Sequence, residues 1–210
     1  MKLRADLHVH SAYSFDSKSP LKKILKKCGD KKIDLIAITD HEEIFGAEKL
    51  SQMAKDLIVI KGEEIDTEYG DIIGLFLKEK VKTKKFFEAV KEIKRQRGLV
   101  VIPHPAMYHI LTDKVVKSAD LVEVFNSRVG SPANNMAGIL SKDFGKPGIA
   151  GSDAHFLFEI GNGVTIINSK SKNPKDIKNA LLSGNFELSC KRSPSIQRYW
   201  TRLVKLWRKR

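Results

Sequence analysis

The chain has 210 residues, of which 41% are hydrophobic, so its length and composition suit one compact domain with a sizeable core. Its two distant cysteines exclude a disulfide framework, and no apolar run approaches the ~20 residues that cross a bilayer. The net charge is +13, and residues 191–210 alone contain eight Lys and Arg and no acidic residue. Because histidines interrupt the N-terminus where a secretory signal needs apolar residues, we expect a cytoplasmic protein.

Short apolar runs rich in β-branched residues alternate with longer amphipathic stretches, which predicts an α/β fold. Strands are expected at residues 3–9, 34–39, 57–62, 71–77, 99–104, 121–126, 148–152 and 164–169. Helices are expected between them, at residues 20–30, 44–56, 83–97, 132–145 and 174–183. This alternation favours parallel pairing of the strands. We expect one domain over residues 1–190 and a basic tail over 191–210.

Histidines and acidic residues gather at the C-terminal ends of these predicted strands. They are His8, His10, Asp40, His41, Glu63, Glu64, His104, Asp153 and His155, and Asn126 ends a strand in the same way. In a closed barrel of parallel strands these ends converge on one face, where such folds build their sites. Residues that are far apart in the sequence are therefore expected to meet in one pocket.

Imidazoles mixed with carboxylates suit borderline divalent metals such as Zn, Mn or Fe. Alternate residues of a strand face the same side, so His8 and His10 can both point toward the barrel axis. A single His-x-His pair is weak support, because a buried histidine often satisfies its hydrogen bonds within a core. That interpretation does not extend easily to five histidines, each beside an acid or at a strand end.

Five motifs carry a resemblance to a known family. DLHVHSAYSFD, ITDHE, GEEI, PHP and GSDAH occur in an order and at a spacing that resemble the PHP family, the polymerase and histidinol phosphatase superfamily, over residues 3–170. The resemblance implies a distorted, TIM-like barrel of seven β/α units. It also implies two or three divalent metal ions and a phosphoesterase activity.

The resemblance implies metal ligands distributed over three neighbouring sites. The first is expected to be formed by His8, His10, Glu64 and Asp153, the second by Glu64 and His104, and the third by Asp16, His41 and His155. The family pattern Gly-x-Glu-aliphatic favours Glu64 over Glu63, which then faces the other way. Asn126 stands where many members have a histidine or cysteine, and an amide is a weak ligand for these ions. The second metal is therefore expected to bind more loosely, to be completed by water or substrate, or to be absent.

Several further roles follow from position. We assign Asp40, His41, Glu64 and Asp153 to the catalytic set. Asp40 orients a ligating histidine or passes a proton to the leaving group, or else it caps the turn after its strand. Arg128 either binds a substrate phosphate, with Asn126 beside it, or is a solvated loop arginine. Glu123 is a solvated carboxylate or one that supports a ligand.

The basic tail is expected to form an amphipathic helix. Its apolar residues follow helical spacing at Ile196, Tyr199, Trp200, Leu203, Val204 and Trp207. Three interpretations remain open, namely a helix docked on the barrel, a surface for nucleic acid, and a helix resting on an anionic membrane. Docking is the commonest role of such helices.

The predicted function is hydrolysis of phosphate esters by a hydroxide generated at bound metal ions. The substrate is a phosphorylated small molecule, a nucleotide or a short oligonucleotide. One alternative is an amidohydrolase-like C–N hydrolase, against which ITDHE and the bridging carboxylate of Glu64 argue. Another is a non-enzymatic, metal-stabilised nucleic-acid-binding protein, against which the nearly complete ligand set argues.

Overall fold

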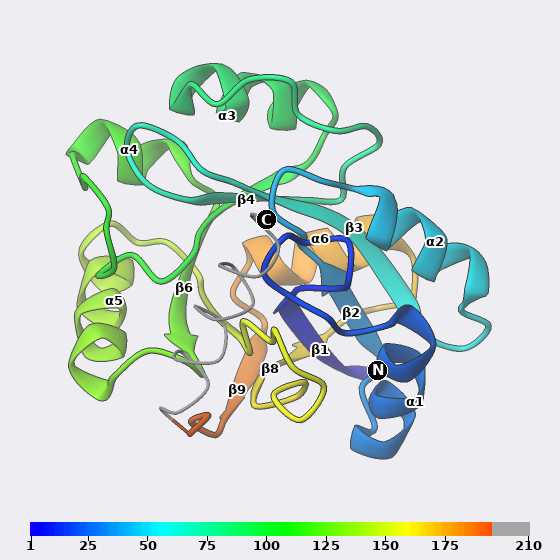
Figure 1. Ribbon diagram of the computed structural model, residues 1–210. Helices are drawn as coiled ribbons and strands as arrows, with labels where there is room; N and C mark the ends of the chain where they lie inside the picture. The colour runs from blue at the N-terminus through cyan, green and yellow to red at the C-terminus, as the bar shows by residue number, and fades with distance from the viewer. Residues whose placement is uncertain (195–210) are drawn as a thin grey trace.

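The computed structural model describes residues 1–194, and within them nine strands form one sheet in the order β7-β6-β5-β4-β3-β2-β1-β8-β9. The strands are β1 (Lys2–Val9), β2 (Leu35–Ile38), β3 (Ile58–Ile65), β4 (Ile72–Leu75), β5 (Leu99–Ile102), β6 (Leu121–Asn126), β7 (Gly148–Gly151), β8 (Gly163–Asn168) and β9 (Phe186–Cys190). The sheet curls so that β7 returns to β1, where Val9 pairs in parallel with Ala154 (Figure 1). The result is a nearly closed barrel, which confirms the predicted fold class.

Five of the helices lie around the outside of the curled sheet in Figure 1. They are α1 (Leu21–Lys31), α2 (Phe45–Met53), α3 (Phe86–Arg95), α4 (Asp113–Ser118) and α5 (Ser131–Asp143). The sixth, α6 (Pro174–Leu182), packs Ile177 and Leu181 into the apolar cluster that fills the barrel interior. That cluster includes Leu3, Ala5 and Leu7 of β1. Apolar side chains therefore fill one end of the barrel and leave the C-terminal ends of β1, β2 and β3 for polar groups.

Parallel pairing holds for only part of the sheet. The strands β1, β2 and β3 pair in parallel, as do β5, β6 and β7. However, β4 is antiparallel to β3 and β5, and β8 is antiparallel to β1 and β9. The expectation of parallel pairing throughout is wrong for these strands. Residues 66–71 join β3 to β4 without a helix, and a link this short cannot cross back over the sheet.

Two short elements were not expected from the sequence. The strand β9 is an edge strand whose side chains are mostly exposed, so no continuous apolar run marks it. The helix α4 spans little more than one turn and begins where Thr112 accepts a hydrogen bond from Val115 N at 3.3 Å. The predicted helix of the basic tail lies outside the described residues. Within the described residues, no helix is both long and apolar enough to span a membrane.

Side chains and a glycine contact close the barrel between β7 and β8. Thr165 Oγ1 accepts from Ala150 N at 2.9 Å and donates to Ala150 O at 3.1 Å. Gly163 lies so close to β7 that an added Cβ would be 2.1 Å from the carbonyl oxygen of Gly151. Because that atom belongs to the backbone, it cannot move aside as a flexible side chain would. The seam therefore requires glycine at position 163.

We expect Gly163→Ala to lower the free energy of unfolding by about 1–3 kcal/mol, since it overpacks this seam. Gly138, inside α5, is the matched control because an added Cβ there meets nothing within 4 Å. Gly138→Ala should raise the free energy of unfolding by about 0.5–1 kcal/mol, as alanine replaces glycine in a helix interior. Urea denaturation of both variants measures the difference. Equal stability of the two would contradict this account of the seam.

Candidate metal centre

Two β-bulges turn additional polar residues toward the interior of the barrel. In β1 the pairing with β2 slips after Asp6, and in β6 the pairing with β7 slips after Glu123. Leu7 packs in the barrel core and His8 also faces inward, although strict alternation would send neighbours to opposite faces. In β6 the amide of Asn126 donates to Glu123 Oε2 at 2.9 Å, so these two residues share one face. The bulges therefore shape this end of the barrel.

The four residues expected at the first metal converge at the ends of β1, β3 and β7. His10 Nε2 lies 3.2 Å from His8 Nε2, 3.1 Å from Glu64 Oε2 and 3.4 Å from Asp153 Oδ1. His8 Nε2 lies 3.2 Å from Glu64 Oε2. Glu63, by contrast, points out of the barrel and accepts from Val81 N at 2.8 Å. The structure thus brings His8, His10, Glu64 and Asp153 together.

The residues expected at the other two metals flank this group. On one side, His104 Nε2 lies 3.2 Å from Glu64 Oε1. On the other side, Asp16 Oδ2 lies 2.8 Å from His155 Nε2 and 3.4 Å from His41 Nε2. The two oxygens of Glu64 therefore face different neighbours, as a bridging carboxylate would. All eight predicted ligands lie in one continuous cluster.

One side of the cluster is open to solvent. The side chains of His8, His10 and Glu64 are at most 2% exposed, whereas those of His41 and Asp153 are each 14% exposed. The side chain of His104 is 12% exposed. These three partly exposed groups therefore mark the side of the cluster that faces solvent.

Two residues of the cluster have a left-handed backbone. His104 has a φ of 29° and Asp153 has a φ of 53°, and residues other than glycine rarely adopt such backbone angles. Conformations of this kind cost about 1–3 kcal/mol and persist only where surrounding contacts hold them. Here His104 N donates to Glu123 Oε2 at 2.9 Å. The strain turns His104 toward Glu64 at the end of β5.

Glu123 supports several members of the cluster at once. Its Oε1 lies 3.0 Å from His8 Nδ1, on the far side of the ring from Glu64. Its Oε2 accepts from His104 N and from the Asn126 amide. A carboxylate behind a ligating histidine fixes the orientation and tautomer of the ring. The sequence left the role of Glu123 open, and the structure places it as the carboxylate that orients His8.

Asp40 lies beside the cluster but bonds to a neighbouring loop. Its Oδ1 accepts from Ser11 N, and its Oδ2 accepts from Ser11 Oγ at 2.6 Å. Gly46 is needed here, because a Cβ at that position would lie 2.1 Å from Asp40 Oδ2. These contacts go to the loop after β1 and not to the turn after β2, where the capping alternative placed them. They hold the loop that follows His10.

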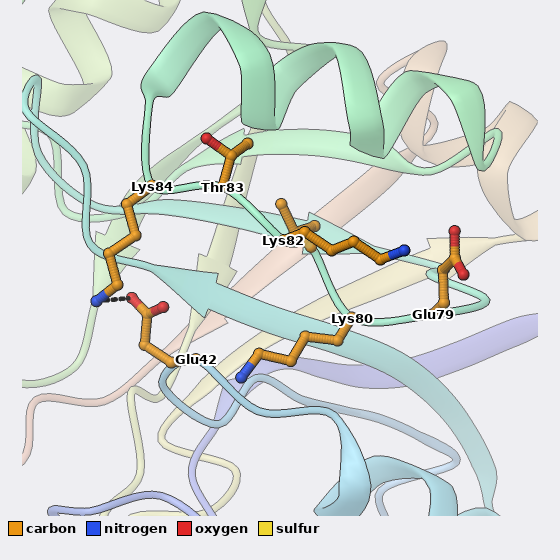
Figure 2. Close-up of a pocket in the computed structure, with 7 residues that line it drawn as sticks. Glu42, Glu79, Lys80, Lys82, Thr83 and Lys84 are labelled. Atoms are coloured by element: carbon orange, nitrogen blue, oxygen red, sulfur yellow. Dashed lines mark ion pairs between the residues drawn. The ribbon is translucent and has the colours of Figure 1, made fainter.

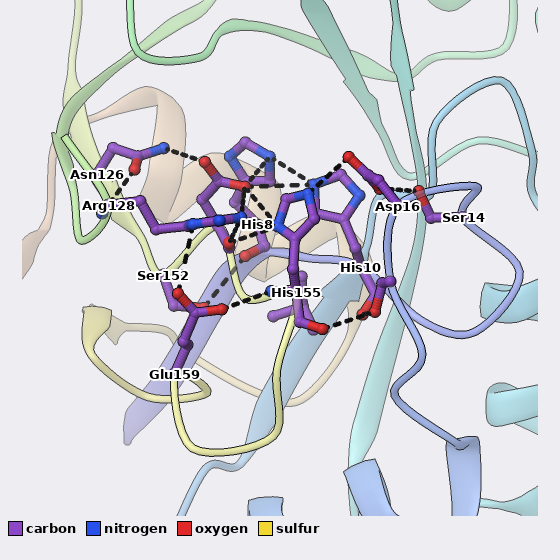
Figure 3. A network of polar contacts seen from close by, with 12 residues as sticks. His8, His10, Ser14, Asp16, Asn126, Arg128, Ser152, His155 and Glu159 are labelled. Atoms are coloured by element: carbon purple, nitrogen blue, oxygen red, sulfur yellow. Dashed lines mark hydrogen bonds and ion pairs between the residues drawn. The ribbon is translucent and has the colours of Figure 1, made fainter. Parts of the chain in front are cut away.

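Arg128 is buried behind the cluster and is not a solvated loop arginine. Its Nε lies 3.3 Å from Glu159 Oε1, and its Nη1 contacts His155 Nδ1 and, at 3.4 Å, Asp153 O. Figure 3 shows this network passing from Asn126 through Arg128 and His155 toward Asp16. Asn126 accepts from Arg128 N at 3.0 Å, so its amide oxygen faces the backbone. The sequence did not single out Glu159, because it follows no predicted strand.

The titration of the cluster is governed by mutual pairing. Burial alone would raise the pKa of Glu64, but His8 and His41 hold it well below its ordinary range. Burial opposes protonation of His104, yet the hydrogen bond to Glu64 raises the pKa of its imidazole to about 9. Burial likewise opposes protonation of His8, while Glu64 and Glu123 raise its pKa well above the usual value. Without a metal, protons on the histidines therefore balance the buried carboxylates.

The donor atoms fit divalent metal ions. The described part of the chain contains three sets of residues whose ligand atoms, within each set, lie no more than 4.8 Å apart. The first set is His10, Asp16, His41 and His155, the second is His8, His10 and Asp153, and the third is His8, Glu64 and His104. Each set mixes imidazole nitrogen with carboxylate oxygen, which suits Zn, Mn or Fe. A cation at such a site replaces protons as the counter-charge of the buried carboxylates.

A barrel with such donor sets at its strand ends is a metal-binding α/β domain, and sequence comparison identifies its family. The PHP domain model matches residues 6–148, and a PHP-associated model matches residues 131–186. The chain belongs to the PHP domain family. An uncharacterized protein of Methanocaldococcus jannaschii is 32% identical over 216 residues, covering 94% of this chain and 87% of that protein.

Solved structures share the fold at low sequence identity. A two-domain protein of Bacteroides vulgatus, which contains a predicted PHP-like metal-dependent phosphoesterase, superposes with a TM-score of 0.79 at 19% identity. The match covers 91% of this chain and 65% of that one. A lesion-specific endonuclease of Pyrococcus furiosus superposes with a TM-score of 0.72 at 17% identity, over 90% of this chain and 58% of its own. The chain thus spans less than two thirds of either structure.

We expect Arg128→Met to lower the free energy of unfolding by about 3–5 kcal/mol, because Glu159 loses its buried charge partner. Arg95, whose exposed side chain pairs with Glu79 at 3.4 Å, is the matched control. Arg95→Met should change stability by less than about 1 kcal/mol, as exposed pairs contribute little. Adding Glu159→Gln to the Arg128 variant should restore part of the loss. Equal effects of the two arginine substitutions in urea denaturation would contradict the buried pair.

Proposed function

We propose that the protein is a metal-dependent phosphoesterase that holds two or three divalent ions, Mn, Zn or Fe, in this cluster. The observation that carries the proposal is the overlap of the three donor sets, which share His8 and His10 and are joined by Glu64. Single metal sites need no such sharing. Neighbouring ions, when bound, polarise the phosphoryl oxygens and supply an activated water.

The ligand assignment follows the three groups of the sequence prediction. His8, His10, Glu64 and Asp153 are proposed for the first ion, Glu64 and His104 for the second, and Asp16, His41 and His155 for the third. The overlap supports two additions, namely His8 for the second ion and His10 for the third. Asn126 is proposed to position Glu123 and Asp153, since its amide nitrogen lies 2.9 and 3.2 Å from their oxygens.

The remaining residues are proposed to bind and to position. His41, His104 and Asp153 border the open side, so they meet the phosphoryl group first and orient it. Asp40 is proposed to act through Ser11, holding the loop between His10 and Asp16. Arg128 is proposed to hold His155 and Asp153 in place, because its burial against Glu159 leaves it poorly placed for a direct phosphate contact.

The substrate is proposed to be a phosphomonoester, a nucleotide or a short oligonucleotide. The fold is shared with a predicted phosphoesterase and with an endonuclease, which supports a site that binds and cleaves at a phosphoryl group. The length of the chain does not specify the part of the substrate beyond that group. A nucleic-acid contact through residues 191–210 also remains a proposal. Only residues 191–194 of that segment belong to the described part of the chain.

Manganese-loaded protein is expected to release phosphate or nucleotide from at least one class among phosphomonoesters, 3′,5′-bisphosphates and short RNA. A chelator should abolish the release, because the proposed ions carry the phosphoryl chemistry. His10→Ala should lower the rate by more than about 100-fold, since it removes a donor shared by two sets. Circular dichroism checks that the variant folds. Hydrolysis of amides but of no phosphate ester would contradict the proposal.

Glu123→Gln is expected to weaken metal binding about 10- to 100-fold, because Glu123 orients His8 from behind. Competition with a chromogenic chelator measures the affinity without using activity. Glu187, on the edge strand β9, is the matched control, as its exposed carboxylate pairs at 2.7 Å with the exposed Lys2 of β1 and with no residue of the cluster. An unchanged affinity in Glu123→Gln, or an equal loss in Glu187→Gln, would argue against this role.

A further inference from the structure

We infer that a lysine-rich segment beside the metal centre binds the phosphate backbone of a single-stranded nucleic acid. This segment, residues 78–85 between β4 and α3, is called the lysine strap below, and its lysines are Lys78, Lys80, Lys82, Lys84 and Lys85. The inference rests on the proposed phosphoesterase function and specifies the class of substrate. The basic tail plays no part in it.

The lysine strap runs along the outer side of β3 toward the metal centre. Val81 N donates to Glu63 Oε2 at 2.8 Å, near the C-terminal end of that strand. Farther along, Lys84 Nζ lies 3.0 Å from Glu42 Oε1. Glu42 in turn donates its backbone N–H to the carbonyl of Glu64 at 3.0 Å. Glu42 therefore links Lys84 of the strap to Glu64, the carboxylate residue at the middle of the cluster.

A hollow of about 560 Å³ lies along the strap. It is lined by Glu42, Glu79, Lys80, Val81, Lys82, Thr83 and Lys84. Figure 2 shows the side chains of Lys80, Lys82 and Lys84 arranged around this space, with the ion pair between Lys84 and Glu42 at one side. The hollow is thus bordered mainly by ammonium groups.

Two of these ammonium groups form no direct ion pair in the described chain, and Lys80 interacts electrostatically with the Glu63 carboxyl without such a pair. The acids of the hollow are already engaged, because Glu42 pairs with Lys84 and Glu79 lies 3.4 Å from Arg95. Lys80 and Lys82 are exposed and form no ion pair among residues 1–194. An anion in the hollow would therefore gain their attraction without displacing an existing pair.

The form of the strap favours a chain of phosphates over a single phosphate. Lysines at alternate positions present repeated positive charge along an extended segment, which suits a polyanion lying beside it. Exposed aromatic rings indicate what kind of polyanion. Phe45 and Tyr108 are 56% and 88% exposed; Phe45 begins α2 shortly after His41, and Tyr108 lies on the loop that follows His104. Lysines that track a backbone and rings that stack bases are the usual elements of single-strand recognition.

The test compares oligonucleotide binding by Lys80→Gln/Lys82→Gln with that of the wild type. Fluorescence anisotropy with a labelled, mixed-sequence single strand gives the affinity across a salt series. We expect binding roughly 5- to 25-fold weaker at 0.1 M salt, and a slope of log affinity against log salt smaller by about 1.4, since each contact to a single strand contributes about 0.7. The matched control is Lys22→Gln/Lys26→Gln on α1, whose exposed lysines form no ion pair with the described residues. The control should bind as the wild type does.

Wild-type affinity and salt slope in Lys80→Gln/Lys82→Gln would overturn the inference, and so would an equal loss in the α1 control. An equal loss of affinity for polyglutamate would overturn the assignment to nucleic acid. Turnover of a small phosphomonoester is measured in parallel and should be unchanged in the strap variant. If the wild type hydrolyses no ester, the proposed function fails, while the binding series still decides whether the strap holds a nucleic acid.

Discussion

The carboxylate of Glu64 is almost completely buried and lies within 3.6 Å of imidazole nitrogens from His8, His10, His41 and His104. A carboxylate taken out of water at this depth costs several kcal/mol unless it is paired and hydrogen-bonded. The four imidazoles provide that compensation through electrostatic attraction and hydrogen bonds to the carboxylate, and a bound cation would add to it. The arrangement of the C-terminal end of the barrel follows from this requirement.

A second set of residues keeps the imidazoles in place. Glu123 is hydrogen-bonded to the His8 ring and accepts from the backbone N–H of His104. Arg128, which pairs with the buried Glu159, contacts the ring of His155. These supporting groups come from β6, from the turn that follows it and from the loop after β7, far from the His-x-His motif in the sequence. They explain how strained backbone conformations at His104 and Asp153 persist. The barrel supplies the rigidity, since apolar side chains and α6 fill its other end.

The charge distribution complements this centre. The cluster is rich in buried carboxylates, whereas the chain as a whole carries a net charge of +13. An excess of cations on the surface attracts anionic substrates and raises their local concentration near the opening. The lysine strap holds part of that excess near the cluster, since Lys84 pairs with Glu42 and Glu42 is hydrogen-bonded to the backbone of Glu64.

Much of this architecture could be predicted from the sequence, because local patterns determine it. Apolar runs located eight of the nine strands, the family pattern Gly-x-Glu-aliphatic separated Glu64 from Glu63, and strand-end histidines marked the cluster. The short link between β3 and β4 is a local feature that requires the reversal of β4. The reversal of β8 and the two bulges, by contrast, depended on pairing between distant segments, which no local pattern encodes. Strict alternation from Leu7 would have turned His8 away from the cluster, and only the bulge in β1 brings it inward. The identity of the cluster residues was thus determined by the sequence, whereas their supports, Glu123, Arg128 and Glu159, were decided by the tertiary structure, since burial and pairing of charge arise only when the barrel closes.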